Sequence, residues 1–291
     1  MTKWIESIAE AAANYDGFVV DQFGVLHDGV SAYPGAADAL ASLRAHGKHV
    51  LVLSNSGKRA APNAARLARF GVGPDHYDEL LTSGELTWQM LDRRDRAPWS
   101  GLGSRVLLLH PPDDRAMVEG LSLEAVTTPE EADFVLLASL AEDDTFERMD
   151  RLLRVAADRR LPLVCANPDR QRLTRRGVVP SSGALAARYA ALGASVIWVG
   201  KPHSLIYDAC RERLQTLGAR RICAIGDSLE HDIGGGARAG FETCLITGGL
   251  YRDEFARAGT AGRDEELARL LRAPEADGTA PPTWILPTLR W

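Results

Sequence analysis

Short apolar runs alternate with amphipathic segments along most of this chain. In the first third, strands are expected at 17–21 and 49–54, and helices at 35–47 and 61–71. In the last third, strands are expected at 195–200, 221–227 and 242–247, with a helix at 204–218. Such alternation is typical of parallel sheets covered by helices. We therefore predict an α/β fold in which the two stretches contribute to one parallel sheet.

The middle of the chain has an α/β pattern of its own. Strands are expected at 105–110, 133–139 and 161–167, and a helix at 145–160. Helices at about 84–95 and 182–192 would carry the chain out of the first sheet and back. The expected domains are 1–82 and 182–291 as a discontinuous core and 83–181 as an insertion. The first fifteen residues are expected to form an amphipathic helix.

Composition and charge exclude several partners. The chain has 34 basic and 39 acidic residues, a formal charge of −5, with both signs scattered. This distribution predicts no nucleic-acid partner and no membrane surface, and no apolar run is long enough to span a bilayer. The four cysteines form no CxxC pair, which argues against zinc and disulfides and favours a reducing cytoplasm. Small molecules are the expected partners.

Four expected strands of the core end in a polar residue. These residues are Asp21, Ser54, Lys201 and Asp227. The carboxyl ends of parallel strands share one edge of a sheet, where open α/β sheets bind their ligands. Two carboxylates, a hydroxyl and an ammonium group at one edge suit a phosphate group with Mg²⁺: the acids hold the metal and the other two hold phosphoryl oxygens.

The sequences around these residues resemble the four motifs of the haloacid dehalogenase-like (HAD) hydrolases. They read "VVDQFGVL" from residue 19, "LVLSN" from 51, "VGKP" from 199 and "IGDSLEHD" from 225, in the family's order. The insertion and the "NPD" at 167–169 resemble the class IIA, or NagD-like, members. The resemblance implies a Rossmann-like parallel-sheet core with an inserted α/β cap domain.

The resemblance also implies roles in catalysis. Asp21 would attack phosphorus as the nucleophile and form an aspartyl phosphate that water hydrolyses. Lys201 would orient Asp21 and neutralise the phosphate, while Ser54 and the backbone N–H of Asn55 would hold its oxygens.

Cofactor and cap residues follow from the same resemblance. Mg²⁺ would be bound by Asp21, Asp227 and the backbone carbonyl of Phe23, with Asp232 holding a metal-bound water. On the cap loop, Asn167, Asp169 or Arg170 would contact the leaving group. A simple Pro-Asp turn is an equal alternative for that loop. Caps of this kind often mediate dimers, so a homodimer is expected.

Phe23 departs from the family pattern. The phosphatases usually carry a second Asp here, which protonates the leaving group and then activates water. Three explanations are open. His27, with Asp28 beside it, could shuttle the proton, although both could equally well only brace the loop at Gly29. The substrate could have a leaving group that needs no proton. Finally, the protein could resemble the dehalogenating members, which carry an aromatic residue here.

The dehalogenating members work without Mg²⁺, whereas Asp227 and Asp232 keep the metal's acidic pair. We therefore expect a Mg²⁺-dependent phosphatase of small phosphorylated metabolites, such as sugar phosphates or nucleoside monophosphates, with reduced activity. The alternatives are a phosphate-binding protein without efficient turnover and a dehalogenase-like hydrolase. The "GGGARAG" at 234–240 is interpreted as packing a helix against the sheet.

Overall fold

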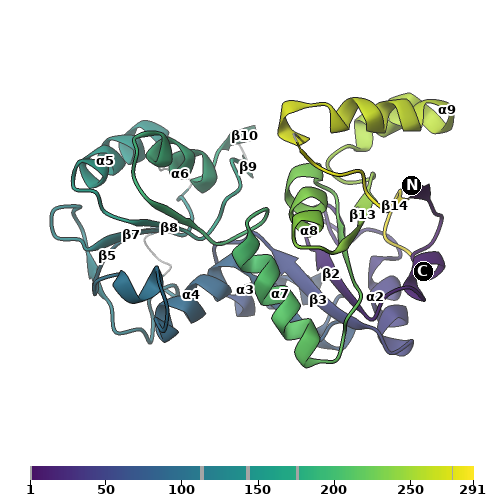
Figure 1. Cartoon of the computed structure of the whole chain (residues 1–291), viewed down its shortest axis with the longest axis horizontal. Helices are drawn as coiled ribbons and strands as arrows, with labels where there is room; N and C mark the ends of the chain where they lie inside the picture. Colours follow the sequence, from purple (N-terminus) through teal and green to yellow (C-terminus); the bar gives the residue numbers. More distant parts are fainter. Residues whose placement is uncertain (1, 112–114, 142–144, 175–176, 277) are drawn as a thin grey trace. The chain divides into compact units, whose positions relative to one another are not determined.

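The computed structural model describes residues 2–111, 115–141, 145–174, 177–276 and 278–291. Its chain divides into two compact units. The first comprises Met1–Ser54, Ala64–Leu81 and Lys201–Trp291, and the second comprises Asn55–Asn63 and Thr82–Gly200. Each unit contains its own sheet (Figure 1). Most of the second unit is therefore an insertion in the chain of the first.

The first unit is built on a seven-stranded sheet in the order β1-β14-β13-β12-β2-β3-β4. Its strands are β1 (Lys3–Trp4), β2 (Gly17–Asp21), β3 (His49–Ser54), β4 (Glu79–Thr82), β12 (Ile222–Gly226), β13 (Glu242–Ile246) and β14 (Trp284–Leu286). The neighbours from β1 through to β3 all pair in parallel. All residues of β2 and β12 are buried, which is expected for central strands covered on both faces.

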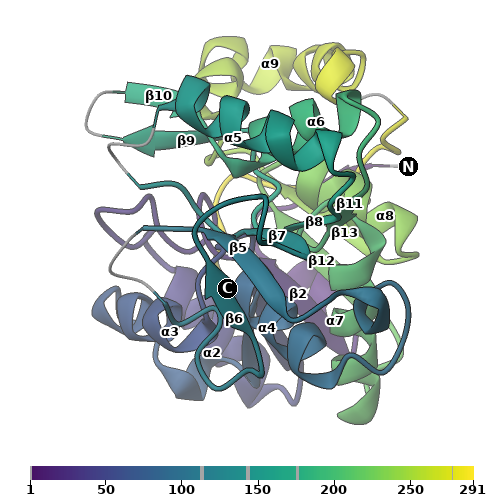
Figure 2. The same cartoon turned by 90° about the vertical axis from the view of Figure 1, so that its left-hand side faces the viewer.

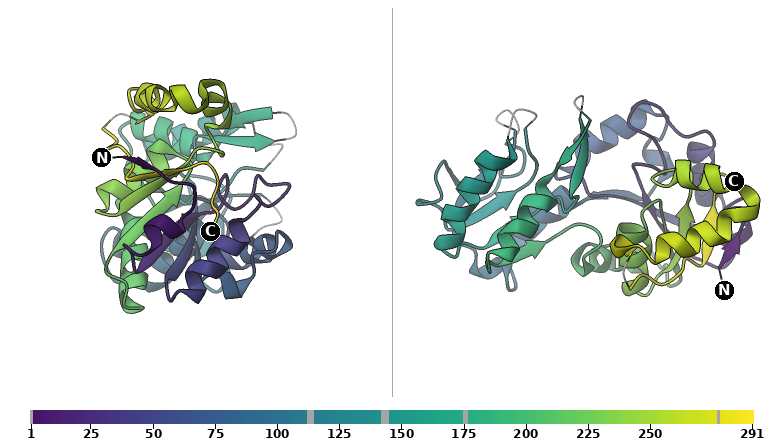
Figure 3. Two further views of the ribbon diagram at one scale, coloured as in Figure 1. Left: turned by 90° about the vertical axis from the view of Figure 1, so that its right-hand side faces the viewer. Right: turned by 90° about the horizontal axis from the view of Figure 1, so that it is seen from above.

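Helices flank this sheet (Figure 3). They are α1 (Ala9–Ala12), α2 (Ala36–Ala45), α3 (Ala60–Arg69), α7 (Ser204–Thr216), α8 (Gly235–Arg238) and α9 (Arg252–Leu271), with 3-10 turns Pro74–His76 and Pro274–Ala276 and a π-helical turn Leu229–Gly234. Most of them bury apolar residues toward the core. Leu267 and Leu270 of α9, for example, pack in one cluster with Leu245 of β13 and Ile285 of β14.

The second unit contains a five-stranded sheet in the order β11-β8-β7-β5-β6, with parallel pairing throughout. Its strands are β5 (Arg105–Leu109), β6 (Glu124–Val126), β7 (Phe134–Leu137), β8 (Leu163–Cys165) and β11 (Val196–Trp198). The remaining elements are α4 (Ser83–Arg93), α5 (Phe146–Asp158), α6 (Ser182–Ala191), a 3-10 turn Trp99–Gly101, and the antiparallel hairpin of β9 (Gln171–Thr174) and β10 (Gly177–Pro180). Figure 2 shows α5 and α6 side by side.

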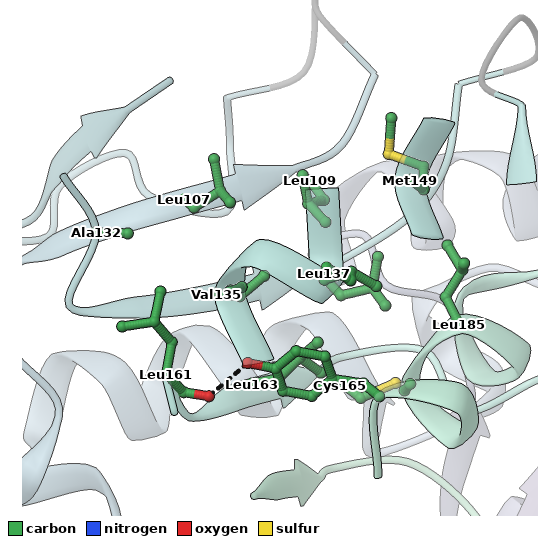
Figure 4. Close-up of a cluster of buried hydrophobic side chains, with 14 of the residues drawn as sticks. Leu107, Leu109, Ala132, Val135, Leu137, Met149, Leu161, Leu163, Cys165 and Leu185 are labelled. Carbon is green, nitrogen blue, oxygen red and sulfur yellow. Dashed lines mark hydrogen bonds between the residues drawn. The ribbon is translucent and has the colours of Figure 1, made fainter. Parts of the chain in front are cut away.

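A hydrophobic cluster joins α5 and α6 to this second sheet (Figure 4). Met149 of α5 and Leu185 of α6 pack there with Leu137 of β7 and other strand residues. The hydroxyl group of Tyr189 in α6 donates a 2.6 Å hydrogen bond to the backbone carbonyl of Leu161. This unit therefore has an independent core.

Two expectations about the elements are wrong. The strand expected at 195–200 in the core sheet is β11, which pairs with β8 in the second sheet. A three-residue apolar strand fits either sheet, and the chain returns to the first unit only after Gly200. The first fifteen residues do not form one helix. Instead β1 pairs with β14 at the edge of the first sheet, and only the short α1 follows.

The glycine-rich segment at 234–240 packs a helix against the sheet, as expected. A Cβ on Gly236 would lie 2.9 Å from Cβ of Ala224 in β12 and 3.2 Å from Cγ2 of Thr243 in β13. Only glycine permits this approach of α8 to the two strands. Among the helices of the described residues, none is both long and apolar enough to cross a membrane.

Candidate active site

The ends of three parallel strands define one edge of the first sheet. In the ladder of β12 and β2, Ile225 pairs with Val20, so Asp227 follows β12 just beyond the level of Asp21. In the ladder of β2 and β3, Asp21 pairs with Leu53, and Ser54 ends β3 one residue later. The shared edge predicted from the sequence is therefore present for Asp21, Ser54 and Asp227.

Lys201 reaches this edge by a different route from the one expected. It follows β11 of the second sheet and is the first residue of the returning chain. Its ammonium group lies 2.5 Å from Oδ1 of Asp21 and 2.7 Å from Oδ1 of Asp232. The lysine is only 3% exposed, so both ion pairs are buried. One ammonium group thus fixes the orientation of two carboxylates.

Three carboxylates crowd together at this site. Asp21, Asp227 and Asp232 are all buried, and one oxygen of each lies within 4.8 Å of the others. Burial raises the pKa of Asp227 to about 7, helped by the charge of Asp232. Burial also raises the pKa of Asp21 well above its usual range, against the opposing effect of Lys201. Negative charge is therefore in excess at the site.

This donor set fits a magnesium ion. When all three carboxylates are ionised, the single ammonium group leaves an excess of two negative charges, which a divalent cation would cancel. Clustered carboxylate oxygens are also the ligands that Mg²⁺ prefers in proteins. The residues that would hold the ion are Asp21, Asp227 and Asp232.

Backbone groups after β13 complete the environment of Asp227. The N–H of Leu250 donates a 2.8 Å hydrogen bond to Oδ2 of Asp227. A Cβ on Gly249 would overlap the same carboxylate and lie 2.6 Å from the carbonyl oxygen of Gly24. The sequence alone did not indicate these residues. The glycines directly after the apolar run at 242–247 were the available signal, because that strand ends at the same sheet edge.

Tyr207 is a further residue of the site that the sequence alone did not indicate. Its buried hydroxyl group, on α7, donates a 2.6 Å hydrogen bond to the carbonyl of His231, inside the π-helical turn that carries Asp232. The backbone N–H of Ser228 donates to Oδ2 of Asp232 at 3.1 Å. π-Helical turns are rare and occur frequently at functional sites. Nothing in the sequence around Tyr207 indicates this long-range contact.

His27 is placed as a bracing residue of the loop that follows Asp21. Its ring stacks on Phe70 at 4.5 Å between centroids and meets the edge of Phe23 at 5.8 Å. Nδ1 accepts the backbone N–H of Gly29 at 2.9 Å. Burial, and then the charge of Arg66, lower the pKa of His27 to about 4, so the ring is neutral at pH 7.

Asp28 closes the same loop. Its Oδ1 accepts the backbone N–H groups of Val30 and Ser31 at 2.8 and 2.7 Å, and Gly29 has a φ of +93°. These two backbone bonds hold the pKa of Asp28 below its usual range. Together with the placement of His27, this geometry favours the bracing alternative over a proton shuttle.

The second unit brings together three of the residues expected to contact substrate. Nδ2 of Asn55 donates to Oδ1 of Asp169 at 2.7 Å, and the backbone N–H of Asp169 donates to Oδ1 of Asn167 at 3.0 Å. Arg170 follows with an exposed side chain. Asn55 is thus tied to the "NPD" loop by its side chain, a contact that the sequence did not suggest.

Gly200 lies against this group. A Cβ at this position would lie 2.5 Å from Cδ of Pro168, 2.5 Å from Oγ of Ser83 and 2.6 Å from Oδ1 of Asn55. Ser83 in turn donates to Oδ1 of Asn55 at 3.4 Å. The glycine before Lys201 is therefore required by the close approach of three segments of the second unit.

Models of known protein families match most of the chain. Two models described as haloacid dehalogenase-like hydrolase match residues 18–124 and 85–240. A HAD-hydrolase-like model matches residues 198–289.

Individual proteins resemble the chain over most of its length. Mouse chronophin is 31% identical over 258 residues, which cover 87% of each chain. The sugar-phosphatase AraL of Bacillus subtilis is 28% identical over 239 residues, covering 80% of this chain and 83% of the relative. A crystal structure of a haloacid dehalogenase-like hydrolase from Brucella suis matches with a TM-score of 0.79 and 26% identity, over 98% and 99% of the two chains.

Proposed function

Because the chain belongs to the haloacid dehalogenase-like hydrolases, in their class IIA, we propose that it is a Mg²⁺-dependent phosphatase of small phosphorylated metabolites. Sugar phosphates and nucleoside monophosphates are the proposed substrates, and the sugar-phosphatase relative supports the first of these. The observation that carries the proposal is the buried contact of Lys201 with both Asp21 and Asp232, beside Asp227.

In the proposed reaction, a carboxylate oxygen of Asp21 attacks phosphorus and the bond to the leaving oxygen breaks. Water then attacks the phosphoryl group on Asp21, which releases phosphate and restores the carboxylate. Lys201 holds Asp21 in one orientation and offsets the charge of the phosphoryl oxygens. Ser54 and the backbone N–H of Asn55 are the proposed further ligands of those oxygens.

The proposed metal ligands are the carboxylates of Asp21, Asp227 and Asp232, the last of them through a water, and the backbone carbonyl of Phe23. When bound, Mg²⁺ would supply positive charge that offsets the phosphoryl group and the crowded acids. Leu250 keeps the carboxylate of Asp227 in place through its N–H group.

Contacts to the rest of the substrate are proposed from the second unit. Asn167, Asp169 and Arg170 are the proposed leaving-group contacts, and the bond from Asn55 to Asp169 would hold their loop in shape. We also propose a homodimer in a reducing cytoplasm. The four cysteines, Cys165, Cys210, Cys223 and Cys244, are free and buried, which is consistent with a reducing compartment.

The test is a phosphate-release screen over a panel of metabolites, with and without Mg²⁺. We expect release that needs Mg²⁺ and is abolished in Asp21→Asn, which removes the nucleophile. Equal release by that variant would contradict the covalent route. Tight Mg²⁺-dependent ligand binding without turnover would instead indicate a binding protein, and halide release without Mg²⁺ a dehalogenase-like hydrolase.

A further inference from the structure

The loop after Asp21 contains two groups that could in principle protonate a leaving group, His27 and Asp28. In the structure, both side chains accept hydrogen bonds from the backbone of the loop. Nδ1 of His27 accepts the N–H of Gly29, so the single proton of the neutral ring is on Nε2. That Nε2 is buried, and the ring is held between Phe23 and Phe70 with the whole residue 2% exposed. A ring fixed in this way cannot turn toward a substrate without breaking the loop.

The carboxylate of Asp28 is likewise hydrogen-bonded to the backbone of the loop. Its Oδ1 accepts two backbone N–H groups, from Val30 and Ser31, that form the turn. A protonated acid would lose much of this pairing, because the oxygen is stabilised as an acceptor. The carboxylate of Asp28 therefore stabilises the turn of the loop.

Phe23 carries an exposed hydrocarbon side chain two residues after the nucleophile. The residue is 53% exposed, whereas Asp21 is 7% exposed. Leu250, whose backbone binds Asp227, is 60% exposed. Two exposed apolar residues are thus linked to the acidic cluster, Phe23 by its place in the chain and Leu250 by its backbone N–H. The ammonium group of Lys201 is engaged by two carboxylates.

We propose that Phe23 makes the site selective for phosphate compounds whose leaving group departs as a stable anion, namely aryl or enol esters and acyl phosphates. This inference rests on the proposed phosphatase reaction and narrows its substrates. Most sugar phosphates and the nucleoside monophosphates are alkyl esters, so the protein would turn them over slowly. When the P–O bond breaks, its electron pair stays on the leaving oxygen. A carboxylate then remains an anion, whereas a basic phenolate takes a proton from water afterwards. Phenols and carboxylic acids, with ordinary pKa values of about 10 and 4, leave readily as anions. An alkoxide is about as basic as hydroxide and leaves slowly.

The experiment is a leaving-group series with the Mg²⁺-loaded protein. The substrates are acetyl phosphate, aryl phosphates from p-nitrophenyl to phenyl, and glycerol phosphate as the alkyl ester. We expect kcat/KM to fall steeply as the pKa of the leaving group rises. A flat dependence would overturn the inference while leaving the proposed phosphatase intact. No Asp21-dependent turnover of any member of the series would overturn the phosphatase itself.

Phe23→Asp tests the residue directly, because it adds a proton donor at an exposed position. We expect kcat/KM for glycerol phosphate to rise by about 10²-fold or more, the usual contribution of an acid, and p-nitrophenyl phosphate to change far less. The matched control is Phe23→Asn. The side chain of asparagine has the same shape as that of aspartic acid but no acidic proton, so this variant should show no such gain. An equal gain in both variants would overturn the role of the missing proton. The wild-type series remains decisive if Phe23→Asp does not fold.

Discussion

The ammonium group of Lys201 lies 2.5 Å from Oδ1 of Asp21, although 180 residues separate them in the chain. It also lies 2.7 Å from Oδ1 of Asp232. Burial by itself would lower the pKa of Lys201, but the charges of the two carboxylates outweigh it and raise the pKa well above its usual range. The lysine is therefore charged at neutral pH.

Lys201→Met should destabilise the metal-free protein by about 3–5 kcal/mol, because it leaves buried carboxylates without their counter-charge. Added Mg²⁺ should restore part of this loss, since it binds the folded state and offsets the same charges. Urea unfolding with and without Mg²⁺ measures both effects. The control is Lys58→Met at an exposed position, with an expected change within about 0.5 kcal/mol. A Lys201→Met protein as stable as the wild type without Mg²⁺ would contradict the prediction.

Tyr207→Phe should weaken Mg²⁺ binding by about 10-fold or more, because the hydroxyl group holds the turn that carries Asp232. It should also cost about 1–3 kcal/mol of stability for the carbonyl left unpaired. Tyr189→Phe is a matched control, since its hydroxyl makes an equally short bond to a buried carbonyl in the core of the second unit. Calorimetric titration with Mg²⁺ compares the metal affinity of the two variants. Equal affinity in both would refute a positioning role for Tyr207.

Stability should fall on acidification between pH 6.5 and pH 4, in part because of His27. The pKa of His27 is about 4 in the folded protein, lowered first by burial, against an ordinary value of 6.5. In this window the unfolded chain binds a proton that the folded chain does not, which favours unfolding by at most about 3 kcal/mol. His27→Gln should reduce this acid-dependent loss in urea unfolding at several pH values. The control is His46→Gln, at an exposed position outside this loop. An unchanged profile in His27→Gln would show that the ring is accessible.

Gly200→Ala should destabilise the protein by about 1–3 kcal/mol, because the added methyl group would overlap Pro168, Ser83 and Asn55. Thermal unfolding monitored by circular dichroism measures the loss. Gly101→Ala is the control, since no atom lies within 4 Å of the added Cβ there. If both variants unfold at the same temperature, the packing around Gly200 is looser than the structure indicates.

Much of the first sheet could be predicted because its central strands are buried on both faces. Runs such as 17–21 are almost wholly apolar and end at an acid, so both the strand and its functional end are visible in the sequence. The short strands β1 and β14 could not be predicted, because each contains too few residues to show a pattern. β1 and β14 contain two and three residues, and their pairing depends on contacts between the two ends of the chain.

The sequence by itself determined which polar residues follow the apolar strands. Their positions predicted that Asp21, Ser54, Lys201 and Asp227 share one sheet edge, and the resemblance to the four motifs added Asp232. Only the tertiary structure decided which sheet the strand before Lys201 joins, and that Tyr207 and Leu250 hold the acids in place. Its placement of the His27 ring between two aromatic rings, with Nδ1 accepting the N–H of Gly29, favours a bracing role over proton transfer, and residue type alone could not show this placement. Composition and periodicity indicate which residues of a segment are apolar. Strand pairing and the burial of polar side chains depend instead on residues far away in the chain.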